Sequence, residues 1–375
     1  MERIMTDSPI RFPGLFGDWT FTAPSKALNI GHGIYWYGII IAVGLVLALA
    51  FCMRRRRQYG LKEDDILDTV LWGIPFGIIG ARLYYVIFYL DLYRNADGSI
   101  QWSRTYAIWD GGLAIYGTVI AVVIVALCVS RARKFKFFAL MDLVVMGLLI
   151  GQAVGRWGNF MNREAFGVET TLPWRMQLTT VTGQLIEVHP TFLYESLWNL
   201  LGLILIATVV SKARRFDGEN TCFYFLWYGF GRFWIEGLRT DSLYLFNWTI
   251  AGEPIRVSQA LSLVMVVLSL FMLLYHIKLR PHSRDELYVN MVAAREAAAA
   301  AAAEDAPAAD DEAPAAGTED TATAAEAPAE APAAAEEERP GAPAESEIPA
   351  DDEAPADEET AVPAETDTPA AGAAD

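Results

Sequence analysis

The chain has 375 residues, of which 53% are hydrophobic, and a formal net charge of −17. Residues 291–375 hold 24 acidic side chains and two arginines, whereas residues 1–290 hold 22 acids and 27 bases. The negative net charge therefore comes from the C-terminal tail, and the first 290 residues are not acidic. No nucleic-acid partner is expected.

The first 33 residues contain acids, prolines and scattered aromatic residues. They lack a continuous apolar core ahead of a small-residue cleavage site, which is the pattern of a processed signal peptide. Residues 1–33 are therefore predicted to form an external N-terminal segment.

Seven long apolar stretches follow, each close to the roughly 20 residues that a helix needs to cross about 30 Å of hydrocarbon. They predict an all-α polytopic integral membrane protein with seven transmembrane helices, in a membrane domain of residues 34–284. The predicted spans are about Ile34–Met53, Ile66–Tyr89, Gly112–Val129, Phe138–Val154, Thr191–Val210, Thr221–Leu238 and Val257–Ile277.

Basic residues gather after the first, third, fifth and seventh of these spans. Loops rich in Lys and Arg stay on the cytoplasmic side of a membrane. The four loops are therefore predicted to be cytoplasmic, with the N-terminus outside and the C-terminus inside. The clusters are Arg54–Arg57, then Arg131, Arg133, Lys134 and Lys136, then Lys212, Arg214 and Arg215, and finally Lys278, Arg280 and Arg284.

Residues 285–375 are mostly Ala, Pro, Glu, Asp and Thr. Such a segment cannot bury enough apolar surface to offset its ordering entropy, so we predict a disordered cytoplasmic tail. Its first part, roughly Asp285–Ala303, is rich in Ala and can extend a helix.

Cysteine and histidine are too sparse to suggest a metal or cofactor site. Cys52, Cys128 and Cys222 lie near predicted cytoplasmic ends of spans, where thiols stay reduced. The histidines are dispersed along the sequence, so neither a metal nor a cofactor is expected. They are His32, His189, His276 and His282.

Three charged residues lie in the otherwise apolar stretch FYFLWYGFGRFWIEGLR. Arg232, Glu236 and Arg239 fall on one helical stripe, with Tyr228 four residues before Arg232. Each lipid-facing charge costs about 2.5–3.5 kcal/mol at mid-helix, so these residues are expected to face protein or a wet cavity. The stripe is either a structural ion pair that joins two helices or an anion site at membrane depth.

Further polar clusters fall at the predicted outer ends of four other spans. Cationic side chains there, among amides, tyrosines and acids, suit a phospholipid head group, because arginine can bind two phosphate oxygens at once. The clusters are Arg156, Asn159, Arg163 and Glu164 in GRWGNFMNREAFG, Gly111, Gly112 and Tyr116 in DGGLAIYG, His189 and Glu195 in HPTFLYE, and Tyr37 in YWYG.

GRWGNFMNREAFG, DGGLAIYG, HPTFLYE and YGFGRFWIEGLRTD closely resemble the signature segments of the bacterial prolipoprotein diacylglyceryl transferases. The resemblance runs from about Gly33 to Ile277. It implies an enzyme of the bacterial cytoplasmic (inner) membrane that moves the sn-1,2-diacylglyceryl group of phosphatidylglycerol to the lipobox cysteine of a prolipoprotein signal peptide. The products are a thioether and glycerol 1-phosphate, in the first step of lipoprotein maturation.

The resemblance also assigns roles to particular residues. Arg156 matches the arginine that binds phosphatidylglycerol, Arg232 a second essential arginine, and Tyr37 the functional tyrosine of the first span. Asn159, Glu164, Glu236 and Arg239 match their motif partners, and Gly111, Gly112 and His189 complete the candidate site. Glu164, Glu236 and His189 are candidates for accepting a proton or for orienting the arginines, without a ranking among them.

Tyr116 stands where many members of the family have a histidine that has been considered as a base. Tyrosine has a reference pKa near 10 and is a poor base at neutral pH, so we expect a positioning role for Tyr116. A non-catalytic phospholipid-binding protein, such as a flippase or scaffold, is the alternative from another class. An enzyme that hydrolyses phospholipid is a third possibility.

Overall fold

The long apolar segments of the sequence form long helices, because every backbone N–H and C=O must be paired within a segment that lies in hydrocarbon. The structure, a computed structural model, describes residues 3–28, 33–95, 97–240, 244–250 and 253–304. Its long helices are α2 (Trp36–Arg55), α3 (Glu63–Phe88), α5 (Ile115–Arg133), α6 (Phe137–Asn162), α7 (Thr191–Leu205), α9 (Glu219–Leu238) and α10 (Val257–Leu274).

Six helical segments of the described chain are long and apolar enough to cross a membrane. The predicted span that is not among these six, Thr221–Leu238, forms α9, which has 20 residues but is less apolar because Arg232 and Glu236 lie in it. The predicted fourth span ends too early. Helix α6 continues to Asn162, so Arg156 and Asn159 lie on its last two turns and not in the loop after it.

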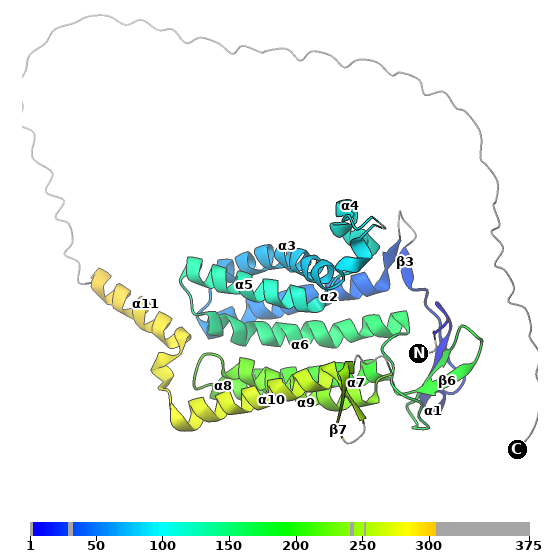
Figure 1. The fold of residues 1–375 in the computed structure, drawn as a ribbon. Coiled ribbons are helices and arrows are strands. Elements are labelled where there is room, and N and C mark those ends of the chain that lie inside the picture. Colours follow the sequence, from blue (N-terminus) through cyan, green and yellow to red (C-terminus); the bar gives the residue numbers. More distant parts are fainter. Residues whose placement is uncertain (1–2, 29–32, 96, 241–243, 251–252, 305–375) are drawn as a thin grey trace, which may run out of the picture. The chain divides into compact units, whose positions relative to one another are not determined.

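Helix α6 runs through the middle of the bundle (Figure 1). It packs against α2 on one side and against α7 and α9 on the other. Helix α3 pairs with α5, and α10 pairs with α9. This central position lets side chains of α6 meet residues that lie 40 to 80 positions later in the sequence.

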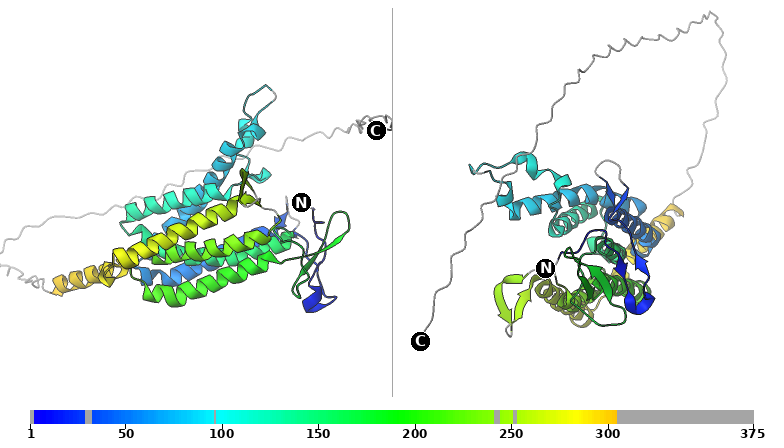
Figure 2. Two further views of the ribbon diagram at one scale, coloured as in Figure 1. Left: turned by 60° about the horizontal axis from the view of Figure 1, so that its bottom comes forward. Right: turned by 90° about the vertical axis from the view of Figure 1, so that its right-hand side faces the viewer.

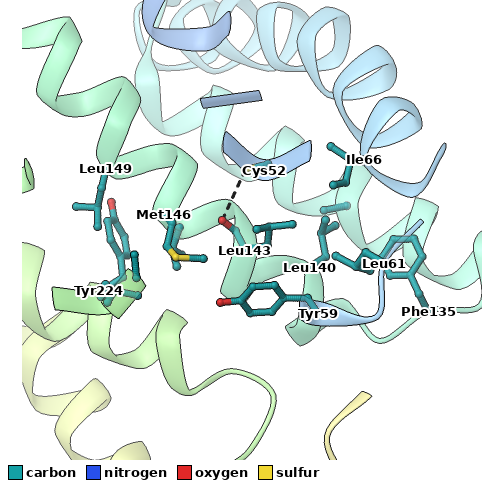
Figure 3. Packing of buried hydrophobic residues seen from close by; sticks show 14 of the residues in the cluster. Cys52, Tyr59, Leu61, Ile66, Phe135, Leu140, Leu143, Met146, Leu149 and Tyr224 are labelled. Atoms are coloured by element: carbon teal, nitrogen blue, oxygen red, sulfur yellow. Dashed lines mark hydrogen bonds between the residues drawn. The ribbon is translucent and has the colours of Figure 1, made fainter. Parts of the chain in front are cut away.

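The larger of two apolar cores lies at the end of the bundle where α6 begins (Figure 3). Leu140, Leu143 and Met146 of α6 are fully buried there, and the Cys52 thiol donates a hydrogen bond to Leu143 O at 3.7 Å. Asp142, also fully buried, accepts hydrogen bonds from Gly218 N at 2.8 Å and Thr221 N at 2.9 Å. This carboxylate satisfies free N–H groups at the start of α9 and so fixes α9 to α6.

A small antiparallel sheet lies at the other end of the bundle (Figure 2). Its strand order is β2 (Thr20–Phe21), β1 (Ile10–Arg11), β5 (Met176–Thr179) and β6 (Leu185–Val188). Two further strand pairs are β3 (Lys26–Leu28) with β4 (Ile34–Tyr35) and β7 (Tyr244–Ile250) with β8 (Glu253–Arg256). The described chain is therefore mostly helical, and the all-α prediction is wrong for the segments that form these strands.

Arg163 holds the N-terminal segment onto this sheet end. Its guanidinium donates to Ser8 O at 2.8 Å, to Ala23 O at 2.9 Å and to Met161 O at 2.6 Å. The side chain is buried and these carbonyls occupy its donors, so Arg163 has a structural role.

The alanine-rich stretch after the last apolar helix forms α11 (Tyr288–Glu304), in agreement with the helix expected near residues 285–303. Leu287 is buried, and the backbone N–H of Tyr288 donates to Asp217 Oδ2 at 2.9 Å. Contacts with the bundle therefore continue past residue 284. The rest of the predicted disordered tail, from residue 305, lies outside the described residues.

Candidate active site

One buried carboxylate, Glu195 of α7, binds arginines from two other helices. Glu195 Oε2 forms an ion pair with Arg156 of α6, and Glu195 Oε1 accepts a hydrogen bond from Arg232 Nη1 of α9 at 2.9 Å. Arg239 Nη1, just after α9, lies 3.5 Å from Glu195 Oε1. Three guanidinium groups, one from α6 and two from the C-terminal half of α9 and the residue after it, thus converge on one acid.

A second buried acid, Glu236, lies one turn after Arg232 on α9. Its Oε2 is 2.7 Å from Arg232 Nη2, an ion pair that lacks the angle of a hydrogen bond, and 4.0 Å from Arg239 Nε. Arg256 bonds to the backbone carbonyl of Glu236 and, at 3.1 Å, to that of Arg239. We call Arg156, Glu195, Arg232, Glu236 and Arg239 the arginine cluster.

The local sequence explains how the cluster is placed. Pro190 precedes α7, so the chain enters the helix in a fixed direction and Glu195 falls in its second turn. Gly167 N donates to His189 O, and Val168 N donates to Leu238 O at 2.7 Å. The segment after α6 is thereby bonded to the start of α7 and to the end of α9. These bonds bring together the three helices that carry the cluster.

Asn159 connects the cluster to a more exposed carboxylate. Asn159 Oδ1 accepts from Arg156 Nη1 at 3.2 Å, and Asn159 Nδ2 donates to Glu164 Oε1 at 2.8 Å. Asn162 donates to the same oxygen at 3.3 Å. Glu164 is exposed, so of the predicted acids it is the one that solvent or a substrate can reach.

The two predicted tyrosines pack against neighbouring helices. The Tyr37 ring of α2 packs against Gly158 of α6, where an added Cβ would lie 2.6 Å from Tyr37 Cδ2. Tyr116 of α5 is 45% exposed and contacts the Tyr84 ring, with 6.2 Å between centroids.

The two predicted glycines form part of a structural loop. Arg82 of α3, a buried residue, donates to Gly111 O at 2.6 Å and to Gly112 O at 3.0 Å, and it also binds the carbonyls of Arg104 and Thr105. Gly112 has φ +70°, and an added Cβ would lie 2.7 Å from Arg82 Nη1. The loop is thus fastened to α3, and the two glycine carbonyls bind Arg82.

His189 lies outside the arginine cluster. Its Nδ1 is 3.1 Å from Tyr194 OH, which also accepts from Trp174 Nε1 at 2.7 Å. Burial lowers the pKa of His189 below the ordinary value for histidine, which favours the neutral imidazole at pH 7. The structure places His189 beside Tyr194, whereas Asn159 is bonded to Arg156 of the cluster and Glu164 is bonded to Asn159.

A small cavity of about 10 Å³ touches the cluster. This is room for about one water molecule. It lies between α7 and α9, and its lining includes Glu195, Trp198, Tyr228 and Arg232.

Comparison with known proteins identifies the family. The family model described as prolipoprotein diacylglyceryl transferase matches residues 25–275. A phosphatidylglycerol–prolipoprotein diacylglyceryl transferase of Listeria welshimeri is 44% identical over 264 residues, 68% of this chain and 91% of that protein. The protein of the same name from Lactiplantibacillus plantarum is 41% identical over 267 residues, 69% of this chain and 91% of that protein. The chain belongs to the prolipoprotein diacylglyceryl transferase family.

The part of the chain that matches the prolipoprotein diacylglyceryl transferase family contains the whole arginine cluster, together with Asn159, Glu164, Tyr37 and Tyr116. Helix α11 and the acidic tail follow the matched part.

The cluster of this family member has unused hydrogen-bond donors. A guanidinium carries several N–H donors in a planar fork. Arg156 has two polar partners, Glu195 and Asn159, and Arg232 has two, Glu195 and Glu236, among the described residues. Both side chains keep some exposure, 21% for Arg156 and 17% for Arg232. Their remaining donors can bind an oxyanion without breaking the contacts to Glu195.

Sequence reasoning did not include two residues that shape the site. The sequence motif HPTFLYE assigns no role to Glu195, although it is the sole acid in α7. No motif includes Arg82, a lone base in the apolar part of α3. A single charge inside an apolar helix is the signal that marks both, because such a charge needs a partner in the protein.

Proposed function

We propose that the chain transfers the sn-1,2-diacylglyceryl group of phosphatidylglycerol to the thiol of a lipobox cysteine in a prolipoprotein signal peptide. A bond forms between the cysteine sulfur and the glycerol carbon as the bond from that carbon to the phosphate oxygen breaks. The electron pair leaves with glycerol 1-phosphate, and the thiol proton passes to a base. The product is a thioether.

The observation that carries this proposal is the convergence of Arg156 and Arg232 on Glu195, with guanidinium donors left over. Glu195 holds the two planar groups in fixed positions from two helices. A phosphodiester that binds between them gains charge-assisted hydrogen bonds, and these strengthen as negative charge moves to the leaving phosphate. Positioned donors that favour the leaving group lower the barrier to the reaction.

The same cations favour the nucleophile. A free cysteine thiol has a pKa near 8.5, and nearby positive charge lowers it and increases the share of thiolate. Glu164 is the favoured proton acceptor, since its exposed carboxylate is linked to Arg156 through Asn159. Glu236 is buried against Arg232 and serves to orient it.

In this proposal the chain crosses the bacterial cytoplasmic membrane seven times, with α9 as the sixth span. The basic loops face the cytoplasm and the arginine cluster lies in the outer half of the membrane, where signal peptides of exported prolipoproteins arrive. The polar residues of α9 support its inclusion as a span, because they pair with Glu195 and face the neighbouring helix.

Transfer of labelled lipid tests the proposal. The purified full-length chain is mixed with phosphatidylglycerol labelled in its acyl chains and with a lipobox peptide. We expect label on the cysteine peptide and release of glycerol 1-phosphate, and no label on the matched Cys→Ser peptide. Lipid binding without transfer would favour a flippase or scaffold, and release of phosphate ester without a labelled peptide would favour a hydrolase.

A further inference from the structure

A second polar cavity lies at the end of the bundle where α6 begins. Its volume is about 370 Å³, within the range of about 300–1,000 Å³ that is usual for small-molecule sites. Arg156 comes 19 residues after the start of α6, so the arginine cluster is about 28 Å away along that helix. The cavity is lined by Lys136, Phe137, Phe138, Phe216, Asp217, His276, Arg280, His282 and Glu286.

Glu286, His282 and His276 form a hydrogen-bonded row in this lining. Glu286 Oε2 is 2.8 Å from His282 Nδ1, and His282 Nε2 is 2.9 Å from His276 Nδ1. The His276 ring stacks on Phe216 with 4.6 Å between centroids. When His282 Nε2 donates to His276 Nδ1, His276 carries its hydrogen on Nε2 and can donate it to a ligand. The Arg280 side chain has no hydrogen bond or ion pair among the described residues.

One acceptor in the lining lacks a partner. Asp217 Oδ2 binds Lys136 Nζ at 3.3 Å and Tyr288 N at 2.9 Å. Asp217 Oδ1 is buried and has no hydrogen-bond partner in the described part of the chain, and the side chain is only 6% exposed. A buried, unsatisfied carboxylate oxygen is costly, so a ligand that donates a hydrogen bond to it is favoured.

The cavity also has an apolar edge. Phe138, on the first turn of α6, is 56% exposed, and the apolar helix α10 leads up to His276 from the side of the membrane-length helices. An anion site whose arginine side chain has no hydrogen bond or ion pair within the described part of the chain, with a buried acceptor and an exposed apolar rim, matches an amphiphile better than a free ion.

We propose that this cavity binds the head group of a phospholipid that carries a hydrogen-bond donor, with Arg280 and His276 on the phosphate and Asp217 Oδ1 accepting from the donor. An ammonium or hydroxyl group a few atoms from the phosphate meets this requirement, as in phosphatidylethanolamine. A trimethylated ammonium, as in phosphatidylcholine, does not. The acyl chains extend past Phe138.

Hydrogen exchange of the full-length chain in detergent tests the proposal. The probe is phosphatidylethanolamine, which is not the acyl donor of the proposed reaction, and the readout is the exchange of amides in residues 276–290. We expect saturable protection there, with phosphatidylcholine at least about tenfold weaker because it cannot donate to Asp217. Equal protection by both lipids would overturn the role of Asp217. Equal protection by inorganic phosphate would show a free-anion site and overturn the lipid assignment.

Substitutions at the cavity supply the matched comparison. Arg280→Gln should raise the half-saturating lipid concentration at least about tenfold, the effect of losing a charge-assisted hydrogen bond. Arg284→Gln removes a charge of the same segment outside the cavity and should leave binding unchanged. Both positions are exposed, so folding is expected to be retained, and melting temperature checks this. Unchanged binding in Arg280→Gln, or the same loss in Arg284→Gln, would contradict the proposal. Transferase turnover, measured on the same samples, reports separately on the proposed function.

Discussion

Glu195 Oε1 lies 2.9 Å from Arg232 Nη1, so a carboxylate of α7 holds a guanidinium of α9. Because the other oxygen of Glu195 pairs with Arg156 of α6, the distance between the two arginines depends on this one side chain. The spacing of the proposed phosphate site is therefore set by a residue that need not touch the phosphate.

Glu195→Gln should lower turnover at least about tenfold, since an amide replaces one acceptor oxygen with a donor that faces a guanidinium. The free energy of unfolding should fall by less than the roughly 3–5 kcal/mol typical of a broken buried ion pair, because both arginines are partly exposed. Glu169→Gln, at an exposed position, is the control for loss of an acid. Full activity in Glu195→Gln would remove this residue from the site.

Arg156→Lys and Arg232→Lys should each cost at least about tenfold in turnover, or roughly 1.4 kcal/mol of transition-state stabilisation. Lysine keeps the charge but lacks the planar fork, so it cannot bind Glu195 and a phosphate together. Turnover and melting temperature are measured on the same preparations. If the lysine variants stay fully active while Glu236→Gln melts early, the cluster is a structural ion pair.

Tyr116→Phe should reduce turnover but leave it measurable, because the ring contact with Tyr84 is kept and only the hydroxyl is lost. Tyr116→His should retain at least partial activity. Steady-state rates with labelled phosphatidylglycerol check both. Complete loss in the Phe variant, with lipid binding intact, would make the hydroxyl part of the chemistry.

Arg82→Lys should loosen the loop of residues 104–112. Lysine cannot reproduce four hydrogen bonds to the carbonyls of this loop, and each lost bond costs about 1 kcal/mol. We expect a lower melting temperature and faster proteolysis between residues 104 and 112. Arg94→Lys, an exposed arginine of the same connection, serves as the control. Identical proteolysis of the two variants would mean that Arg82 does not hold the loop.

Truncation after Glu304 should leave turnover and melting temperature near those of the full chain, because the predicted disordered tail plays no part in the proposed site. Truncation after Arg284 should lower the melting temperature, since it removes buried Leu287 and the bond from Tyr288 N to Asp217. Circular dichroism melts of the two truncated chains make the comparison. A large loss of turnover in the chain truncated after Glu304 would show that the tail contributes to function.

The sequence patterns correctly predicted those features that depend on residues close together in the chain. The helical spacing of Arg232, Glu236 and Arg239 placed them on one stripe, and the structure joins Arg232 to Glu236 through an i,i+4 ion pair. Hydropathy found the long helices, because an apolar run of that length has few alternatives to a buried helix.

Contacts between distant segments could not be read in the same way. Strands β1 and β2 have two residues each and pair with each other, and they join the sheet because β5 pairs with β1 from more than 150 residues away. Glu195 gave a local sign, a lone acid in an apolar helix, but not the identity of its partners. Gly111 and Gly112 were predicted to belong to the substrate-binding site, whereas their carbonyls bind Arg82, whose approach depends on the packing of α3 against α5.

The pairing of the N-terminal segment with later residues has a consequence for synthesis. The Ser8 carbonyl accepts a hydrogen bond from Arg163, and Arg11 pairs with Gln177. Both N-terminal residues therefore depend on partners that are synthesised much later. At about 5–20 residues per second, the ribosome needs roughly 8–30 s to extend the chain from residue 28 to residue 177. During that time the first segment is outside its final fold while several helices enter the membrane. Helix insertion and closure of the sheet are thus separate events, and the second requires the first.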